Sequence, residues 1–122
     1  MRCMVTRYIS KAKFTPDAFR GLLQNPTDRE QIAREFGDGV GAEMLDFYFD
    51  FSACEAISIW QATSEQMRLL KFQALSSGAF TDIYQSKILT SAELLDLSKS
   101  AANVTPLKAP SMDEIDRMLL DE

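Results

Sequence analysis

Two strand-forming segments joined by a very short connection constrain the fold of this chain most. The first is Phe47-Tyr-Phe-Asp-Phe51, and the second, Glu55-Ala-Ile-Ser-Ile-Trp60, begins after three intervening residues. Large aromatic and β-branched residues recur in both segments with a period of two, which is typical of a pleated, half-buried surface. A gap of a few small residues leaves room only for a hairpin. The sequence therefore predicts an antiparallel strand pair near the middle of the chain.

Length and composition indicate one ordinary globular domain. A chain of 122 residues can bury most of its apolar surface without a metal ion or a disulfide. Its hydrophobic content of 46% and charged content of 25% are common values, and its net charge of −5 argues against nucleic acid or an anionic membrane as a partner. Neither a signal-peptide pattern nor an apolar run of about 18 residues occurs, so we expect a cytoplasmic, soluble protein.

The number and spacing of the cysteine and histidine residues exclude the commonest catalytic and metal sites. The chain has no histidine, so neither a serine protease-type triad nor a histidine-based zinc site can form. Cys3 and Cys54 do not form a CxxC pair, and we expect both to be free, reduced thiols. Glu55 beside Cys54 disfavours the reactive thiolate form. The sequence therefore predicts no metal, no cofactor and no assignable catalytic residue.

Capping signals and hydrophobic periodicity predict the order of elements. Thr15-Pro16-Asp17 is a compact helix start, and both Thr63-Ser-Glu-Gln66 and Thr90-Ser-Ala-Glu93 have the spacing of a capping box. We expect strands over residues 4–13, 43–51, 56–62 and 80–89. We expect helices over 16–24, over a segment containing Ile32, Ala33 and Phe36 that ends at Gly37, over 64–76, and after Thr90.

Alternation within each expected strand separates two faces. In the strand over residues 4–13, one face carries Tyr8, Ser10 and Ala12, and the other carries Arg7, Ile9, Lys11 and Lys13. In the strand over residues 43–51, one face carries Leu45, Phe47, Phe49 and Phe51, and the other carries Asp46, Tyr48 and Asp50. In the strand over residues 56–62, Ile57 and Ile59 lie on one face, and Ser58 and Trp60 lie on the other. The face of the first strand that carries Ser10 and Ala12 is small enough for helices to cover.

The order strand, helix, strand, strand, helix, strand is the split βαβ pattern of ferredoxin-like α+β domains, with a four-stranded antiparallel sheet and helices on one face. We expect this domain to span residues 1–102. Residues 103–110 break regular structure, and a short amphipathic helix starting near Ser111 completes a C-terminal segment over 103–122.

A four-stranded sheet with helices on one side leaves its other face bare. Such a face would expose an apolar patch of several hundred Å², which is more than soluble monomers normally carry. A second copy packed sheet against sheet is the simplest cover. The sequence therefore predicts a homodimer through the open sheet face.

Several segments resemble the GYD-domain family in order and spacing. They are Tyr8-Ile-Ser-Lys-Ala-Lys-Phe14-Thr15, Phe47-Tyr-Phe-Asp-Phe-Ser-Ala-Cys-Glu55 with the apolar strand to Trp60, and Ser77-Gly-Ala-Phe80 leading to Ile88-Leu-Thr-Ser-Ala-Glu93. The resemblance covers about residues 6–95. At the motif that names the family this chain reads Ser52-Ala-Cys-Glu55, keeping only the acidic residue. The resemblance implies a ferredoxin-like fold of the dimeric α+β barrel type, in a mainly bacterial family that largely lacks an assigned activity.

Polar residues of the predicted sheet are the candidates for a site. A dimeric barrel can enclose a small organic molecule, and a buried lysine or carboxylate there could move a proton. The same residues would otherwise face a partner subunit or solvent, with Lys11 and Lys13 pairing across the sheet. The candidates are Lys11, Lys13, Asp46, Tyr48, Asp50 and Trp60 on the strands and Glu55 at the hairpin.

Two functional hypotheses follow. The first is a homo-oligomeric domain that binds a small molecule or a protein partner without catalysis. The alternative is a cofactor-independent enzyme, of the small monooxygenase or isomerase type, that uses the barrel cavity. The second hypothesis depends on analogy between folds.

Overall fold

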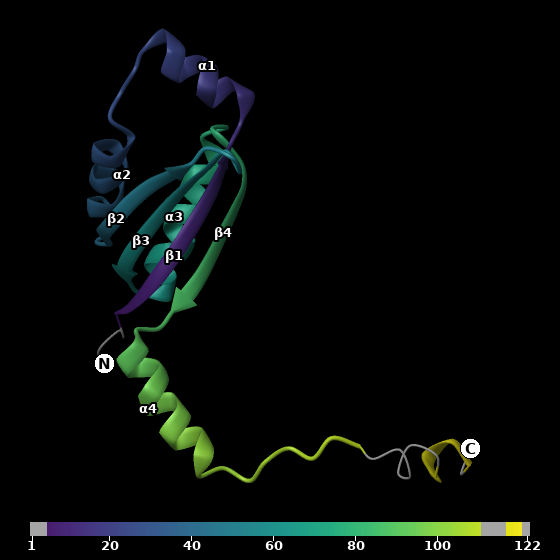
Figure 1. Ribbon diagram of the computed structural model, residues 1–122. Coiled ribbons are helices and arrows are strands. Elements are labelled where there is room, and N and C mark those ends of the chain that lie inside the picture. The colour runs from purple at the N-terminus through teal and green to yellow at the C-terminus, as the bar shows by residue number, and fades with distance from the viewer. Residues whose placement is uncertain (1–4, 111–116, 121–122) are drawn as a thin grey trace. The chain divides into compact units, whose positions relative to one another are not determined.

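The chain divides into two compact units, Met1–Ile88 and Leu89–Glu122 (Figure 1). A computed structural model describes residues 5–110 and 117–120. The described part of the first unit contains β1 (Thr6–Phe14), α1 (Pro16–Gln24), α2 (Arg29–Asp38), β2 (Glu43–Asp50), β3 (Glu55–Ala62), α3 (Ser64–Ser76) and β4 (Phe80–Ile88). These bounds agree with the expected ranges to within the one or two residues by which element ends ordinarily differ.

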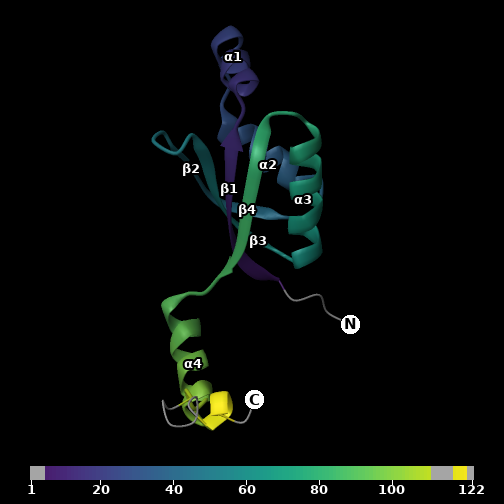
Figure 2. The same cartoon turned by 90° about the vertical axis from the view of Figure 1, so that its right-hand side faces the viewer.

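The four strands form one open antiparallel sheet in the order β2-β3-β1-β4. The α+β class and the antiparallel sheet are therefore confirmed. Helices α2 and α3 lie on the same side of this sheet (Figure 2). Buried residues of β1 and β3, including Ser10, Ala56, Ser58 and Trp60, point to that side, so it is the side predicted from the small residues of the first strand.

Trp60 is the centre of the core between the sheet and the helices. It is 5% exposed and packs in a cluster with Met44, Met67 and Leu70, and its Nε1 donates to the Ser58 hydroxyl at 2.7 Å. An aromatic ring of this size dominates the apolar area that a small core buries. Its hydrogen bond satisfies the single polar group that the ring carries into the interior.

Gly37 allows α2 to approach this ring. A Cβ at Gly37 would overlap the six-membered ring of Trp60 and would also lie close to the carbonyl oxygen of Ala42. α2 ends one residue after Gly37, at Asp38, and Gly39 is its C-cap. The glycine is buried within the last turn, where it serves packing instead of helix termination.

A β-bulge in β2 changes the predicted alternation. The register with β3 shifts between Met44 and Asp46, so that Met44 lies opposite Trp60 in the core and Asp46 lies opposite Ile59 on the open face. Leu45 is the extra residue of the bulge. The strict alternation predicted for residues 43–51 is therefore interrupted at Leu45.

The β2–β3 hairpin has the predicted short connection, residues 51–54. The Asp50 carboxylate accepts from the backbone N–H groups of Ser52 at 3.1 Å and Ala53 at 3.2 Å, which stabilises the turn. Cys54 completes the turn with a φ of 57°, in the left-handed region. Phe51, which alternation assigned to the strand, lies in this loop and is exposed.

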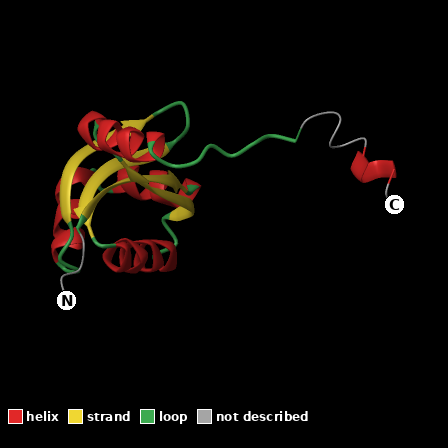
Figure 3. Ribbon diagram, turned by 90° about the horizontal axis from the view of Figure 1, so that it is seen from below, coloured by secondary structure: helices red, strands yellow, loops and turns green. Residues whose placement is uncertain are grey.

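The second unit begins with α4 (Ser91–Ala102), followed by a loop over residues 103–110 (Figure 3). The predicted capping box at its start is present, since Thr90 and Glu93 each bond the other's backbone N–H. All residues of α4 are exposed. The boundary between the two compact units lies before this helix, at 88/89, whereas the sequence led us to expect a boundary after it, at 102/103. Residues 117–120 are helical, and the predicted helix start at Ser111 lies outside the described residues. Among the helices described, none combines the length and hydropathy needed to cross a membrane.

Candidate functional site

A cavity of about 360 Å³ lies between the helix-covered face of the sheet and helices α2 and α3. The cavity is partly open to solvent, and the sequence leaves it unfilled. It does so through small residues on the two central strands, with Ser10 and Ala12 on β1 next to Ala56 and Ser58 on β3. Large residues at these four positions would fill the cavity from the side of the sheet.

Apolar side chains form the walls and both ends of the cavity. Trp60 lies toward one end of the central strands, and Phe14 and Phe80 lie toward the other. The ring of Phe14 packs against Phe80 and Phe49 with centroid separations of 5.5 and 5.1 Å. The helices add Ile32 and Phe36 from α2 and Met67 and Leu70 from α3. The lining is thus mainly hydrophobic and aromatic, which is usual for small-molecule sites.

A band of polar side chains crosses the cavity floor at one level of the sheet. Ser58, Ser10 and Gln85 are neighbours in register on β3, β1 and β4. Ser58 accepts the Trp60 N–H, and the Gln85 side chain donates to the carbonyl oxygen of Met67 at 2.9 Å. Ser10 is only 8% exposed, and its hydroxyl has no hydrogen-bond partner among the described residues.

Two cations line the same cavity. Arg29 is the first residue of α2, and Lys71 lies on α3. In the described part of the chain, neither side chain is within 4.0 Å of a carboxylate oxygen, and no aspartate or glutamate lines the cavity. The site therefore combines an apolar interior with an excess of positive charge.

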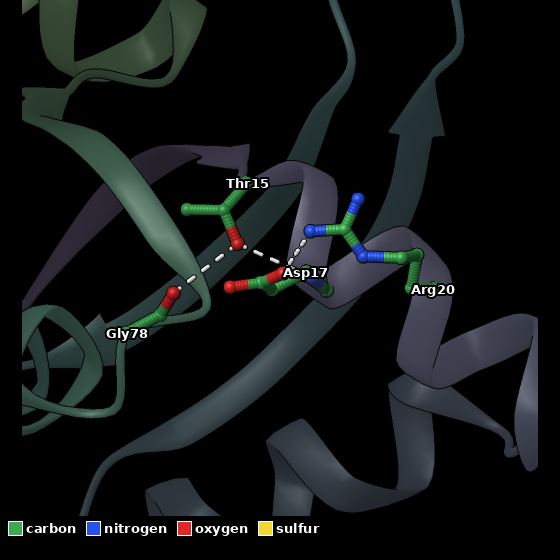
Figure 4. A network of polar contacts seen from close by, with 5 residues as sticks. Thr15, Asp17, Arg20 and Gly78 are labelled. Carbon is green, nitrogen blue, oxygen red and sulfur yellow. Dashed lines mark hydrogen bonds and ion pairs between the residues drawn. The ribbon is translucent and has the colours of Figure 1, made fainter.

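The start of α1 is fixed beside the Phe80 end of this cavity (Figure 4). The Thr15 side chain accepts from the N–H of Ala18 at 3.2 Å and donates to the carbonyl oxygen of Gly78 at 3.1 Å, and Asp17 pairs with Arg20 on the same helix. A smaller hollow of about 270 Å³ lies against α1 and shares Phe14, Arg29, Ala79 and Phe80 with the larger cavity. Arg29 thus borders both spaces.

Six of the seven predicted site residues lie together on the opposite, open face of the sheet. Tyr48 and Lys11 flank Ile57 in register, and Asp50 and Lys13 flank Glu55. None of the six lines the cavity. The six are Lys11, Lys13, Asp46, Tyr48, Asp50 and Glu55.

Trp60 is the predicted site residue that the structure separates from the other six. It lies on the helix-covered face and lines the cavity. The expected pairing of Lys11 and Lys13 across the sheet is not observed, because no ion pair of either lysine occurs among the described residues. Asp50 stabilises the hairpin turn through its carboxylate.

The cavity residues that the sequence did not single out are Ser10, Ser58, Arg29, Lys71 and Gln85. For Ser10 and Ser58 one signal was available in the sequence, since small residues at alternate positions of two neighbouring central strands leave volume that helices cannot fill. The two cations gave no such signal, because their positions depend on how α2 and α3 pack.

Comparisons with known proteins yielded no relationship: no protein-family model, no curated protein and no solved structure matches this chain.

Proposed function

We propose that this chain is a binding domain without catalytic activity that holds a small apolar molecule between its sheet and helices α2 and α3. The observation that carries this proposal is the cavity of about 360 Å³, kept open by small residues at the centre of an otherwise apolar lining. Its volume, hydrophobic lining and few convergent polar groups are the usual properties of ligand sites.

Binding fits this cavity better than the alternative of a small monooxygenase or isomerase. A general base must lie within hydrogen-bond reach of the proton that it removes. The carboxylates considered for such a role, Asp46, Asp50 and Glu55, lie on the other face of the sheet. The described lining of the cavity contains no carboxylate or thiol, and its lysine, Lys71, is partly exposed instead of buried.

A neutral apolar probe tests this proposal. Decan-1-ol should bind the protein with a change in the fluorescence of Trp60, which is the single tryptophan of the chain and lines the cavity. The variant Ala74→Leu, which adds volume to the lining from α3, should weaken this binding at least about tenfold, the effect of losing roughly 1.4 kcal/mol. Ala12→Val provides a second filling variant from the floor.

Ser76→Leu is the matched control, because it adds the same kind of apolar side chain to an exposed position of α3 that does not line the cavity. Affinity should stay unchanged in this variant. Calorimetry that detects no binding by the unmodified protein, or equal binding by all variants, would contradict the proposal.

We also propose that the open sheet face pairs with a second copy of the chain. Its centre is apolar, with Ile9, Ile57 and Ile59 beside Tyr48 and Tyr84, which are 65% and 55% exposed. Such a patch is typical of an interface.

The charges on this face support a symmetric partner. The central strand β1 carries Lys11 and Lys13, whereas the edge strands carry Asp46 on β2 and Asp82 on β4. A two-fold interface brings a patch against itself, so a face with both signs of charge can be complementary to its own copy. Light scattering at micromolar concentration should give the mass of a dimer, and a stable monomer would contradict this proposal.

The more specific fold assignment follows from these proposals. The strand order β2-β3-β1-β4, with β1 and β3 central, supports a ferredoxin-like topology, and pairing through the open face would give the dimeric α+β barrel. The relationship to the GYD-domain family, the bacterial origin and the cytoplasmic location stay predictions.

A further inference from the structure

We propose that the ligand of this cavity is an apolar anion of the medium-chain carboxylate class, with its carboxylate bound by Arg29 and Lys71 and its apolar chain lying against the aromatic and aliphatic walls. This inference depends on the binding function proposed above and specifies the chemistry of the ligand.

The first argument is the charge of the lining. The chain as a whole carries a net charge of −5, yet this cavity is lined by two cations and no carboxylate among the described residues. Both side chains are partly exposed, so their charges keep part of their hydration, and neither lies within 4.0 Å of a carboxylate oxygen among the described residues. An anionic group on the ligand would supply the missing partner for both side chains.

A comparison within α2 shows that Arg29 lacks the contacts that another arginine of this helix makes. Arg34, on the same helix, reaches Glu30 at 3.9 Å and donates to the carbonyl oxygen of Met44 at 2.6 Å. Arg29 has neither kind of contact among the described residues, although its side chain is only partly exposed. Its guanidinium group is therefore available to a ligand.

The second argument is the polar chemistry of the floor. The Ser10 hydroxyl lines the cavity and has no hydrogen-bond partner among the described residues. It is accessible from the cavity, since Thr6 Oγ1 is the only buried side-chain polar atom without a partner in the described part of the chain. A carboxylate is an acceptor that suits both this O–H donor and the two cations.

The size of the cavity limits the ligand. A volume of about 360 Å³ corresponds to roughly a dozen water-sized groups, taking about 30 Å³ for each. A saturated carboxylate with about ten carbon atoms has this bulk. Its chain would contact Trp60, Phe14 and Phe80, and its head group would contact the cations contributed by α2 and α3.

Three probes of matched length test the inference: decanoate, decan-1-ol and decylammonium. Titration calorimetry, together with the fluorescence of Trp60, should show that decanoate binds at least about tenfold more tightly than decan-1-ol, because charge-assisted hydrogen bonds are roughly twice as strong as neutral ones. Decylammonium should bind more weakly than both. Competition between decanoate and decan-1-ol should place them in one site.

The variants Lys71→Met and Arg29→Met remove one charge each and keep most of the side-chain bulk. Each should weaken decanoate binding about fivefold to tenfold and leave the affinity for decan-1-ol within about twofold. Arg68→Met is the matched control, since Arg68 is exposed on the same helix as Lys71 and does not line the cavity. Lys71→Gln repeats the test with a polar replacement, and circular dichroism checks that each variant is folded.

Two results would overturn the inference while leaving the proposed binding function intact. The first is equal affinity for decanoate and decan-1-ol at one shared site. The second is a preference for decanoate that persists in both the Arg29 and the Lys71 variants. If none of the three probes binds, the proposed binding function itself fails, so the two failures are distinguishable.

Discussion

At the scale of single residues, the contact between Gly37 and Trp60 opposes the intrinsic preference of the helix. Alanine is favoured over glycine inside a helix by about 0.5–1 kcal/mol. At Gly37, however, a Cβ would overlap the buried ring of Trp60, and overpacking of this kind typically costs about 1–3 kcal/mol. We expect Gly37→Ala to lower the free energy of unfolding measured with urea.

Gly21 provides the opposite case, because nothing lies near the position of its Cβ. Gly21→Ala should therefore be neutral or stabilising. In the Gly37→Ala background, Trp60→Phe should recover part of the lost stability, since the smaller ring removes the overlap. Independent, additive effects of the two substitutions would show that the contact does not form.

Cys54 is the second residue at which local geometry sets the expected outcome. Its φ of 57° lies in the left-handed region, which costs a residue with a side chain about 1–2 kcal/mol. Glycine avoids this cost but loses more entropy on folding, so we expect Cys54→Gly to stabilise the protein by up to about 1 kcal/mol. Thermal unfolding measures the change. Cys54→Ala, which removes the thiol but keeps the Cβ, should show no such gain; an equal gain would assign the effect to the thiol.

At the scale of elements, two helices begin with the same capping box but differ in what they pack against. Thr63 and Gln66 bond each other's backbone N–H groups at the start of α3, which buries Met67 and Leu70. We expect Thr63→Ala to lower the free energy of unfolding of the first unit by about 1 kcal/mol. Urea denaturation followed by Trp60 fluorescence reports on this unit.

The capping box of α4 supplies the control. Thr90→Ala removes the equivalent bond from a helix that has no buried residue and belongs to the other compact unit. This change should leave the unfolding of the first unit unaltered while increasing amide exchange in the first turn of α4. Equal destabilisation by both substitutions would mean that the two units unfold together.

At the scale of the whole molecule, the open sheet face determines the proposed assembly. Ile57 lies at the centre of this face, between Tyr48 and Lys11 in register. Ile57→Asp would remove apolar area from the centre of the proposed interface and place there a carboxylate that loses hydration on pairing, even with Lys11 beside it, so we expect it to shift the protein from dimer to monomer at micromolar concentration. Light scattering after size-exclusion chromatography measures the mass.

Leu69→Asp makes the same chemical change on α3, which lies on the helix-covered side of the sheet, and should leave the mass unchanged. Lys11→Glu is a milder variant that keeps the apolar centre but reverses a charge of β1; it should weaken the dimer without unfolding the chain. A dimer that withstands both Ile57→Asp and Lys11→Glu would place the interface elsewhere.

Local signals in the sequence predicted most of the elements. The capping boxes at Thr63 and Thr90, the helix start at Thr15 and the short β2–β3 connection all formed as expected. Each of these features depends on residues a few positions apart, whose interactions are nearly the same in any fold. The choice of the covered face also followed from the sequence, because small residues on β1 favour close packing by helices.

Features that depend on distant residues were not predictable in this way. The bulge at Leu45 depends on the register with β3, and the role of Gly37 depends on the position of the Trp60 ring. The predicted site was assembled from polar residues of the strands, and six of its seven members lie on the face opposite the cavity. Polarity in a strand identifies a face of the sheet but not the space beside it.

The sequence by itself determined which segments become strands and helices and where the helices begin, since these choices are made by neighbouring residues. Only the tertiary structure decided where the cavity lies and which charges line it. That cavity is the volume left when side chains from all four strands and from α2 and α3 are brought together, and no single segment encodes it. For the same reason, the presence of both Arg29 and Lys71 in the lining of one cavity is a property of the packed chain and not of either helix alone.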